Sequence, residues 1–245
     1  MKTFQAATSV FVLTLMMYVP AKSQKVEGKN LGKINLTTFV VKGFGLQYER
    51  QLTRKMTAAL SYSKIPTSSL PFKTYIENQV NDPGVNISAY RLGTSIVTPE
   101  IRFYLSKKGA FHGFYIAPYA RFGSYEITGP VNFTSTLSGQ RTAIFNGKVN
   151  ATTGGLLFGS NFQLSKNLYL DWWIIGASIG GANGNLAAII QLSPDEQISL
   201  KNTIDNVNVP FTKIQSAVNS NGATVSTTGT MVGLRGLGLN IGYRF

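Results

Sequence analysis

The chain ends on Leu237-Gly238-Leu239-Asn240-Ile241-Gly242-Tyr243-Arg244-Phe245, and this stretch decides the fold. Every second residue is apolar, and the residues between them are glycine or polar. Successive side chains of a β-strand point to opposite faces, so the stretch predicts a strand with one apolar face and one small, polar face. A tilted strand of about nine to eleven residues crosses the apolar layer of a bilayer. The alternative is the last strand of a soluble β-domain.

The apolar row of this strand resembles the C-terminal signal strand of bacterial outer-membrane β-barrels. It consists of Leu239, Ile241, Tyr243 and Phe245. In those proteins a terminal Phe after alternating apolar residues is read by the barrel-assembly machinery. The resemblance therefore implies two partners, the outer-membrane lipids and, during biogenesis, that machinery.

The first 23 residues predict a cleaved export signal. Lys2 gives a positive start, the run from Val10 to Val19 is apolar, and Ala21-Lys22-Ser23 offers small residues for a signal peptidase. A retained anchor is the competing interpretation, but ten apolar residues are short of the roughly twenty that a spanning helix needs. Residues 24–245 are then one domain.

The cysteine count and the hydropathy limit how the chain could meet a membrane. The chain has no cysteine, which excludes disulfides and a lipid-attachment cysteine. No later run approaches about eighteen apolar residues, so a membrane location requires a barrel.

The formal charge of the chain is +13, and loss of Lys2 and Lys22 with the signal leaves 13 − 2 = +11. The cations lie in or beside expected short turns, whereas the long loops are nearly neutral. The turn cations are Arg50, Arg54, Lys55, Lys107, Lys108 and Lys166. A ring of cations at one rim fits anionic lipid headgroups better than a groove for nucleic acid, and we expect no nucleic-acid partner.

Alternating segments predict about eight strands. Their expected ranges are 33–40, 44–50, 56–63, 97–105, 114–122, 155–164, 168–178 and 230–245. Three longer stretches are expected to be loops: 66–91, 126–148, in which Val131 to Ile144 could form a hairpin, and 181–228. Ser193-Pro194-Asp195-Glu196 has the form of a capping box with proline at the first helical position, which predicts a short helix from Pro194 within the last loop.

Apart from a tight link between the first two strands, the links alternate between short and long, which is the layout of bacterial outer-membrane barrels. The fold class expected is therefore all-β, a closed antiparallel up-and-down transmembrane barrel. Pro99 to Gly109 and Gly113 to Tyr119 resemble a family of small barrels of uncharacterised function from the outer membranes of Bacteroidota, broadly of the OmpA/OmpX kind. The resemblance implies a fold and a place in the outer membrane of a Gram-negative cell, and it implies no reaction.

Alternation alone does not say which face meets lipid, because a soluble lipocalin-like barrel inverts the pattern to hold an apolar ligand. Three features favour a barrel whose apolar face points outward to lipid: small residues on the polar face, charges of both signs on that face, and aromatic residues near the strand ends. The aromatics form two expected girdles, one of Tyr48, Phe103, Phe114, Phe162, Tyr243 and Phe245, and the other of Phe44, Tyr62, Phe122 and Phe158.

Charged residues on the polar face are expected to form a structural ion-pair network in the lumen. They are Lys33, Glu49, Glu100, Arg102, Arg121, Asp171 and Arg244. An eight-strand barrel leaves an interior that side chains just fill, so no general diffusion pore is expected.

We expect no catalytic residue, cofactor or metal site. His112, the only histidine, has no neighbouring ligand and lies at a short turn, away from the long loops. Asp171 and Glu100 are explained more simply as ion-pair partners than as a general acid or base. The leading hypothesis is an outer-membrane barrel with a structural or surface-interaction role through its long loops. The alternatives are a secreted barrel that binds an apolar ligand and an outer-membrane lipid-modifying enzyme.

Overall fold

The strand at the C-terminus closes the sheet of this protein. The structure is a computed structural model that describes residues 28–69 and 89–245. Strand β9 (Gly222–Arg244) pairs antiparallel with β7 (Leu168–Ile189) on one side and with β1 (Asn30–Asn35) on the other. The remaining strands are β2 (Phe44–Gln51), β3 (Met56–Ser69), β4 (Arg91–Tyr104), β5 (Gly113–Ser135), β6 (Gly139–Gln163) and β8 (Thr212–Asn219).

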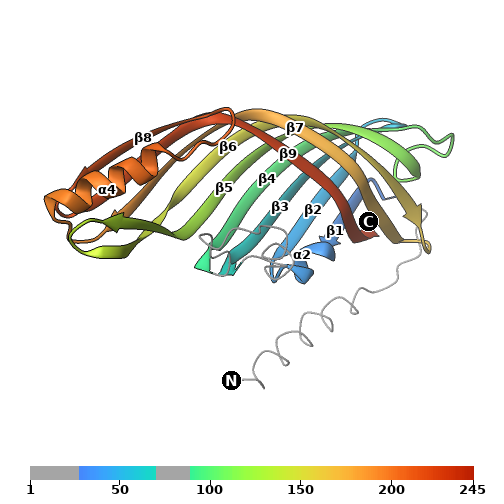
Figure 1. Cartoon of the computed structure of the whole chain (residues 1–245). Helices are drawn as coiled ribbons and strands as arrows, with labels where there is room; N and C mark the ends of the chain where they lie inside the picture. The colour runs from blue at the N-terminus through green and yellow to red at the C-terminus, as the bar shows by residue number, and fades with distance from the viewer. Residues whose placement is uncertain (1–27, 70–88) are drawn as a thin grey trace, which may run out of the picture.

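Eight of these strands form a closed antiparallel ring in the order β1-β2-β3-β4-β5-β6-β7-β9. Strand β8 pairs only with β9 and lies outside the ring. Figure 1 shows the ring curving from blue to red, with β9 returning beside β1. The expectation of an all-β, up-and-down barrel of about eight strands is confirmed. The expected signal segment, 1–23, lies outside the described residues, as does most of the loop expected over 66–91.

The first strand is shorter than predicted. It ends at Asn35 rather than at residue 40, and Thr37–Val40 form the short helix α2. Asn35 causes the turn, because its side-chain oxygen accepts from Thr38 N at 3.1 Å while Thr38 Oγ1 donates to Asn35 O at 2.8 Å. Thr37 Oγ1 holds the turn against β9 by accepting from Leu239 N at 2.9 Å.

The hairpin allowed for Val131 to Ile144 is present, but the rest of 126–148 and much of 181–228 are strands rather than the predicted loops. Strands β5 and β6 run on as one long hairpin to a turn at 136–138, and β7 continues to Ile189. The second stretch also contains α4 (Pro194–Asp205), which starts where the capping box predicted, and the β8–β9 hairpin. Neither helix of the described residues has the length and apolarity that crossing a membrane requires.

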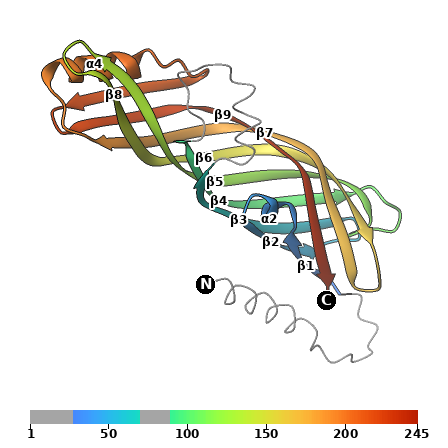
Figure 2. The same cartoon turned by 60° about the horizontal axis from the view of Figure 1, so that its bottom comes forward.

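Two parts of the barrel follow from this layout. The apolar belt is the row of outward, exposed apolar side chains around the ring: Phe44, Leu46, Tyr48, Leu60, Tyr62, Val97, Phe103, Phe114, Phe122, Leu156, Phe158, Phe162, Trp172, Ile175, Ile179, Val232, Leu234, Leu237, Leu239 and Tyr243. The extension is the continuation of the strands beyond it, residues 124–151, 181–189 and 222–229, together with α4 and β8. Figure 2 shows the extension projecting from the ring with α4 and β8 at its far end.

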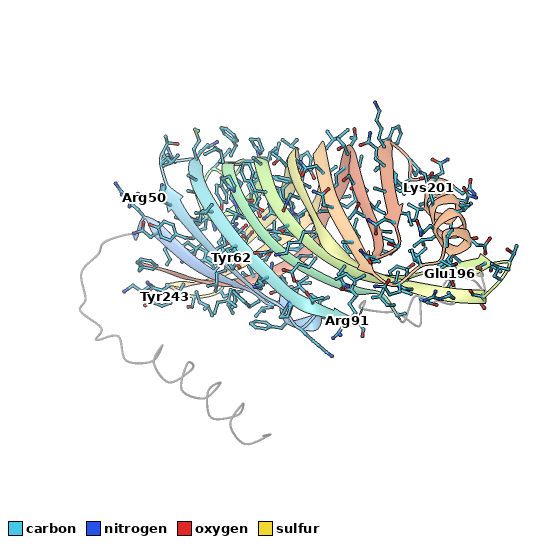
Figure 3. The ribbon with its side chains drawn as sticks, turned by 90° about the vertical axis from the view of Figure 1, so that its left-hand side faces the viewer. Arg50, Tyr62, Arg91, Glu196, Lys201 and Tyr243 are labelled. Atoms are coloured by element: carbon cyan, nitrogen blue, oxygen red, sulfur yellow. The ribbon has the colours of Figure 1, made fainter. Side chains whose placement is uncertain are left out.

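The belt faces outward and the polar row faces inward. On β2, for example, Phe44, Leu46 and Tyr48 are exposed, while Gly45 and Gln47 between them are buried. Tyr62 and Tyr243 mark the outer face of the ring in Figure 3, and Arg50 lies at its short-turn end. All ten aromatic residues of the two expected girdles are exposed. The lumen is therefore the polar side of the sheet, as a membrane barrel requires and a lipocalin-like barrel does not.

The extension reverses this polarity. Its inner face carries Phe133, Ala143, Phe145 and Ala188, which pack with Leu200 and Ile204 of α4 in one buried cluster. Its outer face carries polar residues such as Ser124, Glu126, Lys148, Asn150, Asn183 and Ser226. The same strands thus have apolar residues outside in the belt and inside in the extension.

Candidate functional site

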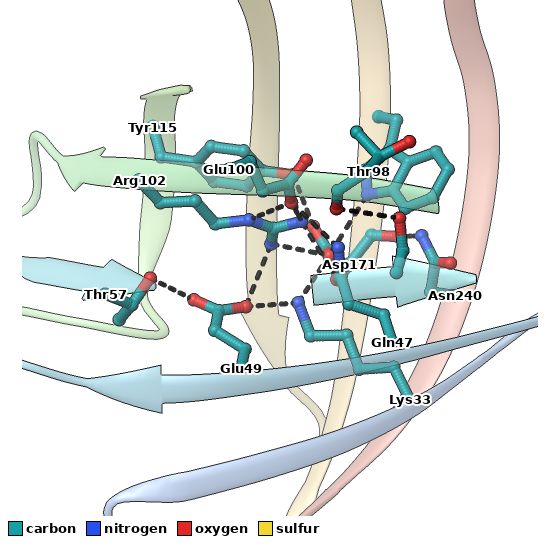
Figure 4. Close-up of polar contacts among 12 residues, drawn as sticks. Lys33, Gln47, Glu49, Thr57, Thr98, Glu100, Arg102, Tyr115, Asp171 and Asn240 are labelled. Atoms are coloured by element: carbon teal, nitrogen blue, oxygen red, sulfur yellow. Dashed lines mark hydrogen bonds and ion pairs between the residues drawn. The ribbon is translucent and has the colours of Figure 1, made fainter. Parts of the chain in front are cut away.

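The lumen beside the belt holds a group of buried charges, which we call the luminal cluster. It comprises Lys33, Glu49, Glu100, Arg102 and Asp171 (Figure 4), together with Arg235. These residues come from β1, β2, β4, β7 and β9. Each of these residues is at most 8 % exposed. Strands far apart in the sequence therefore meet at one ionic centre.

Two cations occupy the middle of the luminal cluster. Lys33 Nζ lies 2.5 Å from Glu49 Oε2 and 2.5 Å from Asp171 Oδ2. Arg102 Nη1 lies 3.0 Å from the same oxygen of Glu49 and 2.7 Å from that of Asp171, and Arg102 Nε donates to Glu100 at 2.7 Å. Each carboxylate is thus shared between two cations, which compensates for removing it from water.

Neutral donors add further hydrogen bonds to the three carboxylates. Tyr104 OH donates to Glu49 Oε1 and Tyr115 OH to Asp171 Oδ1, both at 2.7 Å. Gln47 Nε2 donates to Glu100 Oε1, also at 2.7 Å. Every oxygen of the three carboxylates thus has a donor or a cation within the protein. The arrangement suits a plug that closes the lumen and ties the strands together.

Arg235 is a member of the cluster that the sequence analysis did not include. Its Nη1 lies 2.6 Å from Glu100 Oε2, and its guanidinium lies 4.0 Å from the centre of the Trp173 ring. Strict alternation counted back from Phe245 would place Arg235 outside. The backbone of Leu237 has φ +54°, and Leu237 together with Gly236 breaks the alternation, so Arg235 turns inward.

The structure places Arg121 and Arg244 outside the luminal cluster. Arg244 lies at the short-turn end, where Nε donates to Gly28 O at 2.6 Å and Nη1 to Tyr169 OH at 3.0 Å. Arg121 faces the lumen from β5 but makes no ion pair with any residue that the structure describes. Five of the seven residues expected in the network, Lys33, Glu49, Glu100, Arg102 and Asp171, come together.

The expected assembly signal lies on the outer face of β9. Leu239, Tyr243 and Phe245 are 37 %, 51 % and 57 % exposed. The backbone of Phe245 exchanges two hydrogen bonds with Asn30, at 2.9 and 3.0 Å, and so completes the seam between the last strand and the first.

Residues considered for catalysis or metal binding have structural contacts. His112 Nδ1 lies 2.8 Å from Ala110 O and Nε2 lies 3.0 Å from Gln163 Oε1, at the short-turn end of the ring. In residues 28–69 and 89–245, no group of three or more His, Asp or Glu side chains could hold a metal ion. Trp172 is outside in the belt, and Trp173 points into the lumen.

The start of α4 is fastened to the β5–β6 hairpin in the extension. Glu196 Oε2 accepts from Ser193 N at 2.8 Å and pairs with Arg141 Nη1 at 2.7 Å, and Asp195 accepts from Thr136 N at 3.1 Å. The Arg141 guanidinium and these backbone and hydroxyl donors lower the pKa of Glu196 to about 2. Figure 3 shows Glu196 and Lys201 on this helix at the end of the molecule away from Arg50.

Comparisons with known proteins give a family and one solved structure of low similarity. A family model described as "Protein of unknown function (DUF3575)" matches residues 9–181. Among solved structures, the β domain of the Bordetella autotransporter BrkA is similar at 12 % identity and a TM-score of 0.31, over 90 % of this chain and 99 % of that one. No curated protein matches the chain.

Proposed function

The chain belongs to the family described as "Protein of unknown function (DUF3575)", and we propose that it is an integral outer-membrane β-barrel whose extension presents an interaction surface outside the bilayer. In this proposal residues 1–23 are the export signal, and the barrel-assembly machinery reads the strand that ends at Phe245. The protein would belong with the small outer-membrane barrels of Bacteroidota, broadly of the OmpA/OmpX kind, in a Gram-negative cell.

The reversal of polarity along single strands carries the proposal. On β6, Leu156 and Phe158 are exposed outside in the belt, whereas Ala143 and Phe145 of the same strand are buried inside the extension. A strand in one solvent keeps its apolar side toward one core. The change of side near residue 152 is expected where the strand leaves an apolar medium and enters water.

The height of the belt fits a bilayer. On β5 the outward apolar residues run from Phe114 to Phe122, nine positions, and polar Ser124 and Glu126 follow on the same face. About nine to eleven tilted residues span the hydrocarbon layer. Strand β5 has 23 residues, so more than half of it lies beyond that layer, in the part that pairs with β6 and meets α4.

The lumen supports a structural role rather than transport or catalysis. The luminal cluster crosses the narrow interior, and its carboxylates are engaged by cations and hydroxyl donors, so we propose no general pore, enzymatic activity or cofactor. A secreted barrel with an apolar ligand in its lumen is disfavoured, because the lumen is polar and the apolar side chains are outside.

Fractionation combined with site-specific proteolysis tests the proposal. A specific protease site is inserted in the exposed link 207–210 between α4 and β8, and in a matched variant the same site is inserted in the short β6–β7 turn at 165–166. We expect the protein in the outer-membrane fraction, with heat-modifiable migration on gels. Protease added to intact cells should cut the first variant alone, and protease added to lysed cells should cut both. Recovery of the protein in the soluble fraction without detergent, or cleavage of the β6–β7 turn in intact cells, would overturn the proposal.

A further inference from the structure

The described part of the lumen contains more cations than carboxylates. Four cations line its middle, namely Lys33, Arg102, Arg121 and Arg235, against three carboxylates, those of Glu49, Glu100 and Asp171. The three carboxylates are bound by the other three cations. Of these four luminal cations, Arg121 therefore has no carboxylate partner among the residues that the structure describes.

Arg121 faces a cavity of about 250 Å³ next to the luminal cluster. Arg235, Thr94, Ser61 and Trp173 also line it, and Thr38 of α2 places it toward the end of the lumen opposite the short turns. One water occupies about 30 Å³, so the cavity has room for a small molecule and several waters, and it is too small for a lipid.

Three shielded donors along this cavity have no hydrogen-bond partner within the described part of the chain: Arg121 Nε, Arg235 Nη2 and Thr94 Oγ1. Buried donors are normally paired, and a buried guanidinium without a counter-charge is costly. Three unpaired donors around one cavity, two of them on guanidinium groups, favour an acceptor that carries negative charge, although the unpaired Asn240 Oδ1 on the same cavity is itself an acceptor.

We propose that this cavity binds one small oxyanion, which Arg121, Arg235 and Thr94 hold. A guanidinium offers paired N–H groups that match two oxygens of a phosphate or a carboxylate, and a threonine hydroxyl donates to a third. Arg235 is suited to the role because its other nitrogen is fixed by Glu100 and its plane lies over Trp173. The anion brings the charge of the four cations and three carboxylates into balance.

Titration of the refolded full-length protein in detergent with inorganic phosphate, against chloride of equal ionic strength, tests the site. We expect one phosphate per barrel by calorimetry. Arg121→Gln should weaken binding about tenfold or more, since it removes a charge-assisted hydrogen bond. Thr94→Val should weaken it less, and Arg91→Gln, which changes an exposed arginine of β4 outside the cavity, should leave it unchanged. A parallel acetate titration separates phosphate from carboxylate.

Stability without phosphate separates a binding residue from a structural one. Arg121→Gln should be at least as stable as the wild type in chloride, because it removes an unpaired and partly buried charge. Phosphate should raise the unfolding midpoint of the wild type more than that of Arg121→Gln. Absence of saturable binding of either anion to the wild type, or equal binding by Arg121→Gln, would overturn the site. If Arg121→Gln does not fold, weaker binding by Thr94→Val than by the wild type supports the site, and equal binding overturns it. These outcomes are read in detergent, so they do not depend on where the barrel resides in the cell.

Discussion

Arg235 Nη1 lies 2.6 Å from Glu100 Oε2, although the two residues are 135 positions apart in the chain. The pair joins the last strand to β4 across the lumen, and Glu100 also accepts a hydrogen bond from Arg102. The luminal cluster is therefore one connected unit rather than a set of separate bridges. Its members should show energetic coupling when they are substituted together.

The first prediction concerns this pair. Glu100→Gln leaves Arg235 without a carboxylate in the described structure and removes one of the three carboxylates around Arg102, so it should lower the free energy of unfolding by about 3–5 kcal/mol. Glu100→Gln with Arg235→Gln should cost less than the sum of the two single changes, by about 1–3 kcal/mol, since the double variant leaves no unpaired charge at that position. Urea unfolding in detergent or lipid vesicles measures the cycle. Strict additivity would show that the contact does not couple the strands.

The second prediction compares a luminal carboxylate with an exposed one. Asp171 holds both Lys33 and Arg102, so Asp171→Asn should destabilise the barrel by about 3–5 kcal/mol. Asp205→Asn breaks the Lys201 pair on α4, whose side chains are 51 % and 45 % exposed, and should destabilise the protein far less, because water screens an exposed ion pair. Equal losses in the two variants, measured by the same unfolding experiment, would contradict the structural role of the luminal cluster.

The ring was predictable because apolar residues recur at every second position of a barrel strand and all face the same, outer side. Phe44, Leu46 and Tyr48, or Leu239 and Tyr243, alternate with small or polar residues, and all are outside as expected. Arg235 was missed because the irregularity at Gly236 and Leu237 shifts the alternation by one residue. The local sequence does not show where such a bulge falls, so strict alternation places Arg235 outside although it faces the lumen.

A hairpin at Val131 to Ile144 and a helix from Pro194 were anticipated, but the continuous strands of the extension were missed, for a different reason. Phe133, Ala143 and Phe145 alternate as regularly as the belt residues, but they face inward toward α4 rather than outward. The outward-facing apolar residues stop where the strand enters water, so the lipid-facing pattern does not reveal that the strand continues. The capping box at Ser193 was recognisable because its residues act within four positions of one another, whereas the packing of α4 on β5 and β8 depends on distant segments.

The third prediction is a pH dependence at the start of α4. Arg141 and the neighbouring donors lower the pKa of Glu196 from its ordinary value of 4.5 to about 2. Between these values the unfolded segment binds a proton that the folded one does not, so this stabilisation is present above about pH 4.5 and is lost as the pH falls toward 2. Amide hydrogen exchange in α4, compared between wild type and Glu196→Gln at each pH, measures it. The wild type should be better protected at pH 6, and the two should converge near pH 2. A difference that stays constant over this range would exclude Glu196 as the titrating group.

The last prediction uses one face of one strand to locate the edge of the bilayer. Leu156 and Asn150 both point outward from β6, but Leu156 lies in the apolar belt and Asn150 in the extension. In lipid vesicles Leu156→Arg should lower the free energy of unfolding by about 2–4 kcal/mol, because it places a charge among acyl chains, whereas Asn150→Arg should cost at most about 1 kcal/mol. The same arginine at Leu156 would be tolerated in a barrel surrounded by water, where exposed surface changes rarely exceed about 0.5 kcal/mol. A small and equal effect at both positions would therefore show that the belt does not meet lipid, even if the closed ring and its luminal cluster form as described.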